Sequence, residues 1–290
     1  MKVLIIGLDG LEPSLVEKWR IEGFKQKIHG RHYVGSLRTL YTPILWACIL
    51  TGMDVTKHGY DSRSLRVKRA LDGLPGPLRP LYRLRLKLLG GKNLHLRSLM
   101  VKLKLAKAYP PIIMPQHLIE KTFIEKAKRQ GLRVEAIEVP SYNEDRNATY
   151  RGMCAKHALA PLSEKKSLLE ELVEDAHQRI ERSMQAIRDS YDLVFVYLPL
   201  PDLAHHMFFR GLKELILLRA HYGVLESMIQ PLLKLASERG YFSLIISDHG
   251  FDIKKYYHSE YGFWSMSHKP PKEPQTIFDI YDIVTSFLFR

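Results

Sequence analysis

The stretch KVLIIGLDG, residues 2–10, contains a five-residue apolar run that ends at Asp9 and Gly10. A short apolar run closed in this way is typical of a buried strand in a parallel sheet. Two later stretches repeat the pattern, LVFVYLPL at 193–200 and YFSLII at 241–246. The chain therefore places an aspartate at or just beyond the end of several expected strands.

Helical patterns separate these strands, at 117–130, 163–190 and 212–239, and a weaker strand is expected at 132–139. Strands that alternate with helices predict an α/β fold with a mainly parallel central sheet and helices on both faces. In such sheets ligands bind beyond the carboxyl ends of the strands, so we expect the functional site there.

Composition narrows the class of protein. A hydrophobic content of 46% and a charged content of 26% exclude a disordered or fibrous chain. Two cysteines exclude a disulfide framework and fit a reducing compartment. The sequence has no apolar run of the roughly 18 residues that a membrane helix needs, and its first apolar run is too short for a signal peptide. We expect a soluble cytoplasmic protein with a single catalytic domain over 1–290.

The net charge of +13 is concentrated in one segment. Residues 63–107 contain thirteen Lys and Arg residues and a single acid, Asp72, whereas the remainder is close to neutral. We interpret 61–113 as a basic insertion or cap within the domain. Its run at 82–89 alternates with period two and its run at 94–109 also fits a helix face, so periodicity leaves both structures open.

A basic insertion is either a solvated surface or a site for something anionic. Interleaved Leu and Lys/Arg favour contact with an anionic membrane surface through 63–107, which would make the protein peripheral at the membrane. Nucleic acid is less favoured, because Tyr82 and Tyr109 are the only aromatic side chains available for stacking.

Carboxylates follow three of the expected strands: Asp9, Asp202 and Asp248. Each could simply cap a helix or shape a turn. If a helix begins at Asp202, however, His206 lies one turn further on the same face, and the pair could share a metal ion. His205 lies about 100° away around the helix axis and is the weaker ligand candidate.

Asp248 and His249 are adjacent, so both can reach one ion only if the chain turns, and we expect Gly250 to permit that turn. A further candidate is Thr42, which precedes Pro43. Pro43 suits the first position of a helix and Thr42 its N-cap. A hydroxyl there lies where a helix N-terminus attracts phosphate, and a metal ion would activate it as a nucleophile.

Five motifs occur in one order along residues 1–60 and 190–290, and together they resemble the type I phosphodiesterase/nucleotide pyrophosphatase family of the alkaline phosphatase superfamily. The middle of the chain carries no motif that we recognise. The resemblance implies an alkaline-phosphatase-like sandwich. The motifs are Asp9-Gly10, Thr42-Pro43 with Trp46 and Thr51-Gly52, Lys57-His58-Gly59, Asp202-x3-His206 and Ser247-Asp248-His249-Gly250-Phe251.

The resemblance implies two divalent metal ions, commonly zinc, and a nucleophilic threonine. The ligands of the first ion would be Asp9, Thr42, Asp248 and His249, and those of the second Asp202, His206 and a later histidine. We prefer His258 as that histidine because it precedes a strand-like stretch, with His268 as the alternative. This mixture of nitrogen and oxygen ligands suits Zn²⁺, with Mn²⁺ as the alternative.

The expected function is hydrolysis of a phosphodiester or phosphoanhydride bond in a phosphorylated small molecule or lipid, with Thr42 as nucleophile. Leu45 stands where extracellular nucleotide pyrophosphatases carry an asparagine that contacts a phosphate oxygen, so nucleotide specificity is not implied. The alternatives are a phosphomonoesterase or phosphotransferase of the same superfamily, or a non-catalytic protein that binds anionic membranes. Nothing in the sequence predicts an oligomeric state.

Overall fold

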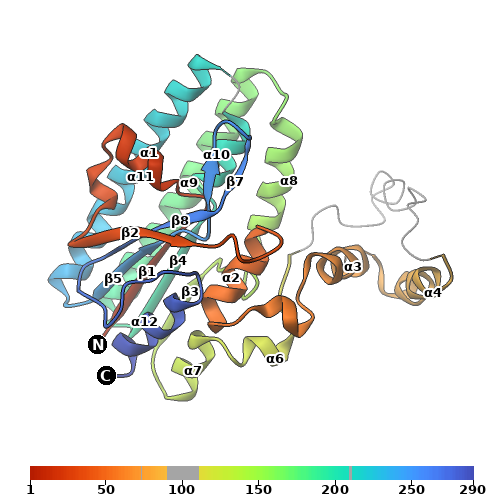
Figure 1. Cartoon of the computed structure of the whole chain (residues 1–290), viewed down its shortest axis with the longest axis horizontal. Coiled ribbons are helices and arrows are strands. Elements are labelled where there is room, and N and C mark those ends of the chain that lie inside the picture. The colour runs from red at the N-terminus through yellow and green to blue at the C-terminus, as the bar shows by residue number, and fades with distance from the viewer. Residues whose placement is uncertain (73, 90–110, 209–210) are drawn as a thin grey trace.

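Six strands form the central sheet of this computed structural model, which describes residues 1–72, 74–89, 111–208 and 211–290 (Figure 1). They are β1 (Val3–Leu8), β2 (Ile28–Tyr33), β3 (Val134–Ile137), β4 (Leu193–Leu198), β5 (Phe242–Ile246) and β8 (Tyr261–Met266). The spatial order is β2-β8-β5-β1-β4-β3. Strands β3, β4, β1 and β5 pair in parallel, and β8 runs antiparallel to both of its neighbours. The prediction of a mainly parallel sheet is confirmed.

Helices surround the sheet, and one hairpin lies outside it. The hairpin consists of β6 (Gly250–Asp252) and β7 (Tyr257–Ser259). Three short 3₁₀ turns are η1 (Glu22–Phe24), η2 (Val55–His58) and η3 (Gly76–Leu78). The α-helices are α1 (Pro13–Trp19), α2 (Thr42–Thr51), α3 (Ser62–Asp72), α4 (Arg79–Leu89), α6 (Gln116–Ile119), α7 (Phe123–Arg129), α8 (Asn147–His157), α9 (Leu162–Arg188), α10 (Asp202–Met207), α11 (Leu212–Glu238) and α12 (Asp279–Leu288).

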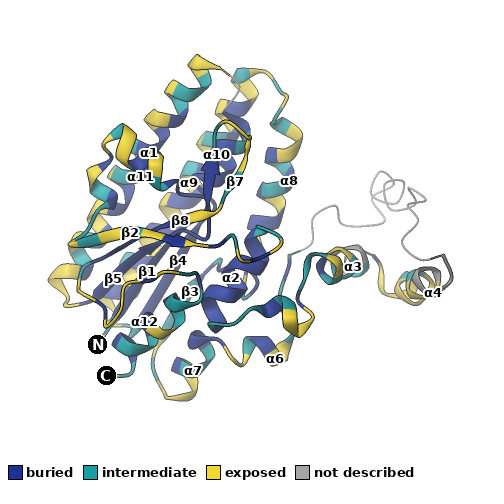
Figure 2. Ribbon diagram, viewed as in Figure 1, coloured by how far each residue is buried: buried dark blue, intermediate teal, exposed yellow. Residues whose placement is uncertain are grey.

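The sheet separates two hydrophobic cores. Neighbouring residues of β1 point to opposite faces, so Ile5 belongs to one core and Ile6 to the other. Helices α2, α7 and α12 cover the Ile5 face, and α1, α9 and α11 cover the Ile6 face. Figure 2 shows β1, β4 and β5 as a buried layer between these helices. Helices on both faces and an α/β fold are therefore confirmed.

The helical patterns at 163–190 and 212–239 correspond to α9 and α11, but the one at 117–130 is wrong as a single helix. It is broken into α6 and α7, because Thr122 is extended (φ −67°, ψ 149°) and caps α7, with Oγ1 accepting from the Glu125 N–H over 3.2 Å. Helix α8 was not predicted at all, since its apolar residues do not form a clear stripe.

The basic segment begins with α3 and α4, which lie at one side of the molecule away from the sheet (Figure 1). The run at 82–89 is helical, as part of α4, rather than extended. Leu65 and Leu74 are buried, whereas Leu81 and Leu84 are 63% and 54% exposed. The run at 94–109 lies outside the described residues. Within the described ranges, no helix has the length and apolar character that crossing a bilayer requires.

Candidate metal centre

Strand order brings the three predicted aspartates together. Strand β1 lies between β4 and β5 and is parallel to both, so the carboxyl ends of these three strands are neighbours. The backbone N–H of Asp202 donates to the backbone carbonyl of Asp9 over 2.8 Å. The N–H of Gly10 lies 3.4 Å from Oδ1 of Asp248. A side chain on Gly10, which has φ +70°, would meet Cβ of Asp202 at 2.7 Å, so the close approach requires glycine there.

Asp9, Asp248 and His249 form the first set of converging ligand atoms, and all three are buried. Nε2 of His249 lies 3.4 Å from Oδ1 of Asp9 and 3.5 Å from Oδ2 of Asp248. The other ring nitrogen, Nδ1, lies 2.9 Å from the Gly250 carbonyl. Because a carbonyl only accepts, Nδ1 carries the proton of the neutral ring, and Nε2 presents a lone pair to the two carboxylates.

Asp202, His206 and His258 form the second set. Helix α10 begins at Asp202, so His206 lies one turn along on the same face, with Nε2 3.4 Å from Oδ1 of Asp202. Nε2 of His258, on β7, lies 3.6 Å from the same oxygen and 3.1 Å from Nε2 of His206. Nδ1 of His258 donates to the Leu40 carbonyl over 2.8 Å, which leaves its Nε2 unprotonated in the neutral ring.

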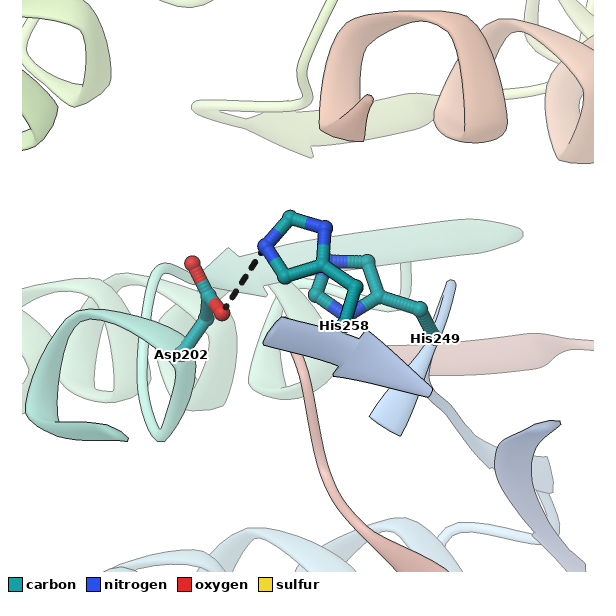
Figure 3. A group of neighbouring side chains, drawn as sticks. All are labelled: Asp202, His249 and His258. Atoms are coloured by element: carbon teal, nitrogen blue, oxygen red, sulfur yellow. Dashed lines mark ion pairs between the residues drawn. The ribbon is translucent and has the colours of Figure 1, made fainter. Parts of the chain in front are cut away.

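The two sets are contiguous. The rings of His249 and His258 stack with their centroids 3.7 Å apart. Figure 3 shows this stack beside Asp202, with the Asp202–His258 contact dashed. Ligand atoms of Asp202, His249 and His258 all lie within 4.8 Å of one another. The two sets therefore form one contiguous cluster of ligand atoms.

Four buried atoms at the centre of this cluster have no hydrogen-bond partner among the described residues: Oδ1 of Asp9, Oδ1 of Asp202, Oδ2 of Asp248 and Nε2 of His249. Leaving a buried polar atom unpaired is costly, and here the atoms are acceptors that face one another. Divalent cations bind such groups of imidazole nitrogen and carboxylate oxygen. The residues present therefore fit a metal centre.

The electrostatics agree with that fit. Burial, followed by the neighbouring Asp202 carboxylate, raises the pKa of Asp9. Burial and the Asp9 carboxylate raise the pKa of Asp248 well above its usual value. Burial lowers the pKa of the His258 imidazole to about 3, so that ring is neutral at pH 7. Without a cation, burial therefore disfavours the negative charge of Asp9 and Asp248. The pKa of Asp202 is lowered instead, because the neighbouring imidazoles, His206 first, outweigh the effect of burial.

Thr42 is the first residue of α2 rather than its N-cap. Tyr41 occupies the N-cap position, so the N-cap interpretation of Thr42 was wrong by one residue. The Leu40 carbonyl accepts a hydrogen bond from His258. The Trp46 ring packs edge-on against the Tyr197 ring, with 5.3 Å between the ring centroids. The Tyr197 hydroxyl in turn donates to Oδ2 of Asp9. Contacts on both sides of buried Thr42 thus connect its helix to the two ligand sets.

The other candidate histidines point elsewhere. Nε2 of His205 lies 2.9 Å from the Tyr222 hydroxyl, and its ring stacks on Phe251. His268 is exposed, with Nδ1 2.9 Å from Oγ of Ser267. Of the two proposed last ligands, the structure places His258 in the cluster and His268 on the surface.

Glu12 is a residue of the site that sequence reasoning missed. Its Oε2 accepts from the Phe251 N–H over 2.8 Å and from Oγ of Ser259 over 2.7 Å, so it ties the start of α1 to the hairpin that carries His258. Asp248 and His249 both reach the first ligand set, and Gly250 after them does not need a positive φ. Glycine is needed because a Cβ there would lie 2.1 Å from Oε2 of Glu12.

Comparison with known proteins bears on the family and on the fold. A family model described as type I phosphodiesterase/nucleotide pyrophosphatase matches residues 92–261. The match includes the middle of the chain, where we recognised no motif, and the later ligands, but not Asp9 or Thr42. No curated protein matches.

Solved structures similar to this chain include ectonucleotide pyrophosphatases and sulfatases, and the sulfatases are those that show the fold. Murine ectonucleotide pyrophosphatase/phosphodiesterase 5 is 15% identical, with a TM-score of 0.44 over 86% of this chain and 57% of that one. The 2-O GAG sulfatase BT1596 is 9% identical, with a TM-score of 0.55 over 99% and 70%. A putative sulfatase from Bacteroides thetaiotaomicron is 8% identical, with a TM-score of 0.54 over 99% of this chain and 70% of that one. The chain thus has an alkaline-phosphatase-like fold and spans 57% of the length of the murine protein.

Proposed function

Since the chain belongs to the type I phosphodiesterase/nucleotide pyrophosphatase family, we propose that it is a metal-dependent phosphohydrolase that cleaves phosphodiester or phosphoanhydride bonds. The observation that carries the proposal is the set of four buried, unpaired ligand atoms on Asp9, Asp202, Asp248 and His249. A purely structural cluster would pair these atoms with one another or with backbone groups.

In the proposed centre, two groups of side chains would each hold one divalent cation. We expect zinc, with manganese as the alternative. Asp9, Asp248 and His249 form one group, and Asp202, His206 and His258 the other. When bound, the cations would supply Lewis-acid stabilisation of negative charge on the phosphoryl oxygens. The Tyr197 hydroxyl holds Oδ2 of Asp9 and so orients Oδ1 toward His249.

Thr42 is the proposed nucleophile. Its oxygen forms a bond to phosphorus while the bond to the leaving oxygen breaks, and water then hydrolyses the phosphothreonine. The hydroxyl proton passes to solvent, and the leaving oxygen takes up a proton. The position of Thr42 at the start of α2 supports this role, since the positive end of the helix dipole favours the negative charge of a phosphoryl group there.

The decisive experiment combines metal analysis with two substrates. Purified protein is analysed for bound metal and assayed with Zn²⁺ or Mn²⁺ on bis(p-nitrophenyl) phosphate and on p-nitrophenyl phosphate. A higher kcat/KM on the diester supports the proposal. A preference for the monoester favours the alternative phosphomonoesterase. Absence of both bound metal and turnover would refute both enzymatic functions and favour the non-catalytic reading.

We further propose that the basic segment 63–107 docks on an anionic membrane surface, which would place a cytoplasmic protein peripherally at the bilayer. In its described part, Arg63, Arg66, Arg79 and Arg83 are exposed. Leu81 and Leu84 are exposed on the same helix as Arg83. Basic side chains near an anionic surface contribute about 1 kcal/mol each, and exposed leucines can insert between lipids.

Vesicle sedimentation tests this docking. The protein should bind phosphatidylserine-containing vesicles at low salt, release as ionic strength rises, and not bind neutral vesicles. Replacing Arg83, Arg85 and Lys87 with Gln should weaken binding and leave metal content unchanged. The matched control replaces Lys166, Arg188 and Lys234, which are exposed on α9 and α11, with Gln. Equal recovery with neutral and anionic vesicles would leave the segment as a solvated surface.

A further inference from the structure

Arg151 on α8 has a guanidinium group that is only partly used. Its Nη2 donates to both carboxylate oxygens of Glu144, over 2.7 and 2.9 Å. The Glu144 side chain is fully buried and also accepts from the Ile112 N–H over 3.0 Å, so it is firmly anchored. Nη1 of Arg151 is buried and has no hydrogen-bond partner in the described parts of the chain. One donor nitrogen is therefore held in place with nothing to donate to.

The anchor of this guanidinium is tied to the start of α2. Ser141, three residues before Glu144, donates from Oγ to the Pro43 carbonyl over 2.7 Å. Against the effect of burial, Glu144 and then Tyr197 and Tyr41 raise the pKa of Arg151, so both tyrosines lie near its charge. Tyr41 precedes Thr42, and the Tyr197 hydroxyl donates to Asp9. The guanidinium thus lies close to the chain that carries the proposed nucleophile.

A second residue of α8 and the packing of this helix also bear on the position of Arg151. Helix α8 packs against α10, which carries Asp202. Cys154 is one turn after Arg151 on the same helix face and is buried. After burial itself, the Asp202 carboxylate is the main cause of the raised pKa of its thiol, about 12. Arg151 and Cys154 therefore share one face of α8, the helix that packs against α10.

A phosphate oxygen near Thr42 lacks a donor from α2 itself. Leu45 has no polar group, and its side chain is fully buried in the core on the Ile5 face of the sheet. We propose that Arg151 is a substrate-binding residue whose Nη1–H donates to a non-bridging oxygen of the phosphoryl group beside Thr42. This inference rests on the proposed function. It assigns recognition of the phosphate to α8 rather than to the first turn of α2.

The competing explanation is that Arg151 only neutralises buried Glu144. A double variant separates the two roles, because Arg151→Met with Glu144→Gln removes both charges and leaves no buried carboxylate uncompensated. The matched control is Arg146→Met. Arg146 lies just before α8 and pairs instead with Asp175.

The measurement is calorimetric binding of inorganic phosphate to the metal-loaded protein, which needs no turnover. We expect the double variant to keep its metal and to bind phosphate roughly 10- to 100-fold more weakly, as loss of a charged hydrogen bond predicts. The control should stay within about twofold of wild type. Should the double variant fail to fold, Arg151→Lys takes its place, since lysine retains the ion pair but lacks the guanidinium fork.

Unchanged phosphate affinity in the variant, loss of its bound metal, or no phosphate binding by wild type would each overturn the assignment. Failure of the proposed function has a different signature. A wild-type protein that binds phosphate through Arg151 yet hydrolyses neither nitrophenyl ester would refute the hydrolase and leave the phosphate site intact.

Discussion

Nδ1 of His258 donates to the backbone carbonyl of Leu40 over 2.8 Å, and this single contact joins the hairpin to the chain that enters α2. It fixes the protonation of the ring, so that Nε2 faces Asp202. It also places His258, a proposed metal ligand, beside Leu40, which lies two residues before Thr42 in the sequence. The proposed nucleophile and the second ligand set are therefore positioned together.

Thr42→Ala should abolish turnover while the protein stays folded and keeps its metal. Removing a nucleophile typically costs at least roughly 10³-fold in kcat. Thr42→Ser, which keeps a hydroxyl, is the matched control and should retain measurable activity. Near-normal kcat in Thr42→Ala would show that another group attacks phosphorus.

Removing a ligand should lower the metal content. Asp248→Ala, His206→Ala and His258→Ala should each lose a large part of the bound metal, because each contributes an atom to the cluster. His268→Ala, at the exposed alternative position, should keep full occupancy. The measurement is the molar ratio of metal to protein after dialysis. Full occupancy in the first three variants would refute the two-metal centre.

Removing the metal should destabilise the protein, increasingly so as pH rises. The pKa values of Asp9 and Asp248 are raised in the fold, so below pH ~4 both folded and unfolded states are protonated and the metal-free fold carries no penalty. Above that pH the unfolded state releases its protons more readily, and stability falls. At 100 times its dissociation constant, Zn²⁺ should restore about 2.7 kcal/mol, or about 5–10 °C in Tm.

Differential scanning calorimetry with EDTA and with Zn²⁺, from pH 4.5 to 7.5, measures this effect. The gap in Tm between the two conditions should widen with pH. A gap that stays constant or narrows would mean that the buried carboxylates are not the groups that the metal neutralises.

Glu12→Gln should loosen the hairpin that carries His258. The carboxylate accepts two bonds from that hairpin, and an amide cannot replace both with equal strength. We expect a loss of about 1–3 kcal/mol in the free energy of unfolding and about 10-fold weaker metal binding. Glu17→Gln on the same helix removes an exposed carboxylate and should change neither quantity.

His32→Leu should reduce the sensitivity of stability to acid. Burial lowers the pKa of His32 to about 3, below the value near 6.5 of the unfolded chain. The unfolded state therefore binds a proton that the folded state does not, and stability falls as pH drops from about 6.5 toward 3. Between pH 7 and 5 this contributes about 1–2 kcal/mol.

Urea unfolding of wild type and His32→Leu at pH 7 and pH 5 measures how much unfolding free energy each protein loses between the two pH values. The variant should lose less stability on acidification than wild type does. His29→Leu, an exposed position on the same strand, should behave as wild type. An identical loss in His32→Leu would show that His32 is protonated in the folded state.

The parallel sheet and three of the ligand positions were predictable from the sequence. A buried strand followed closely by an aspartate is a local pattern, and the carboxyl ends of parallel strands meet at one edge of the sheet. The pair Asp202 and His206 was predictable for the same reason, because helical spacing alone places residues four apart on one face. Local signals failed at 117–130, where a single capping threonine divides the helix.

The amino-acid sequence alone therefore determines the strand ends, the pairing of Asp202 with His206 on α10 and the family motifs. All of these depend on residues that are close together in the chain. Tertiary structure alone decides that His258 enters the cluster while His268 stays on the surface, because β7 pairs with β6 and turns His258 toward Asp202. It alone brings Glu12 to the hairpin and Arg151 to the start of α2. Those contacts join residues far apart in sequence, and their energy comes from burial and pairing that no local pattern records.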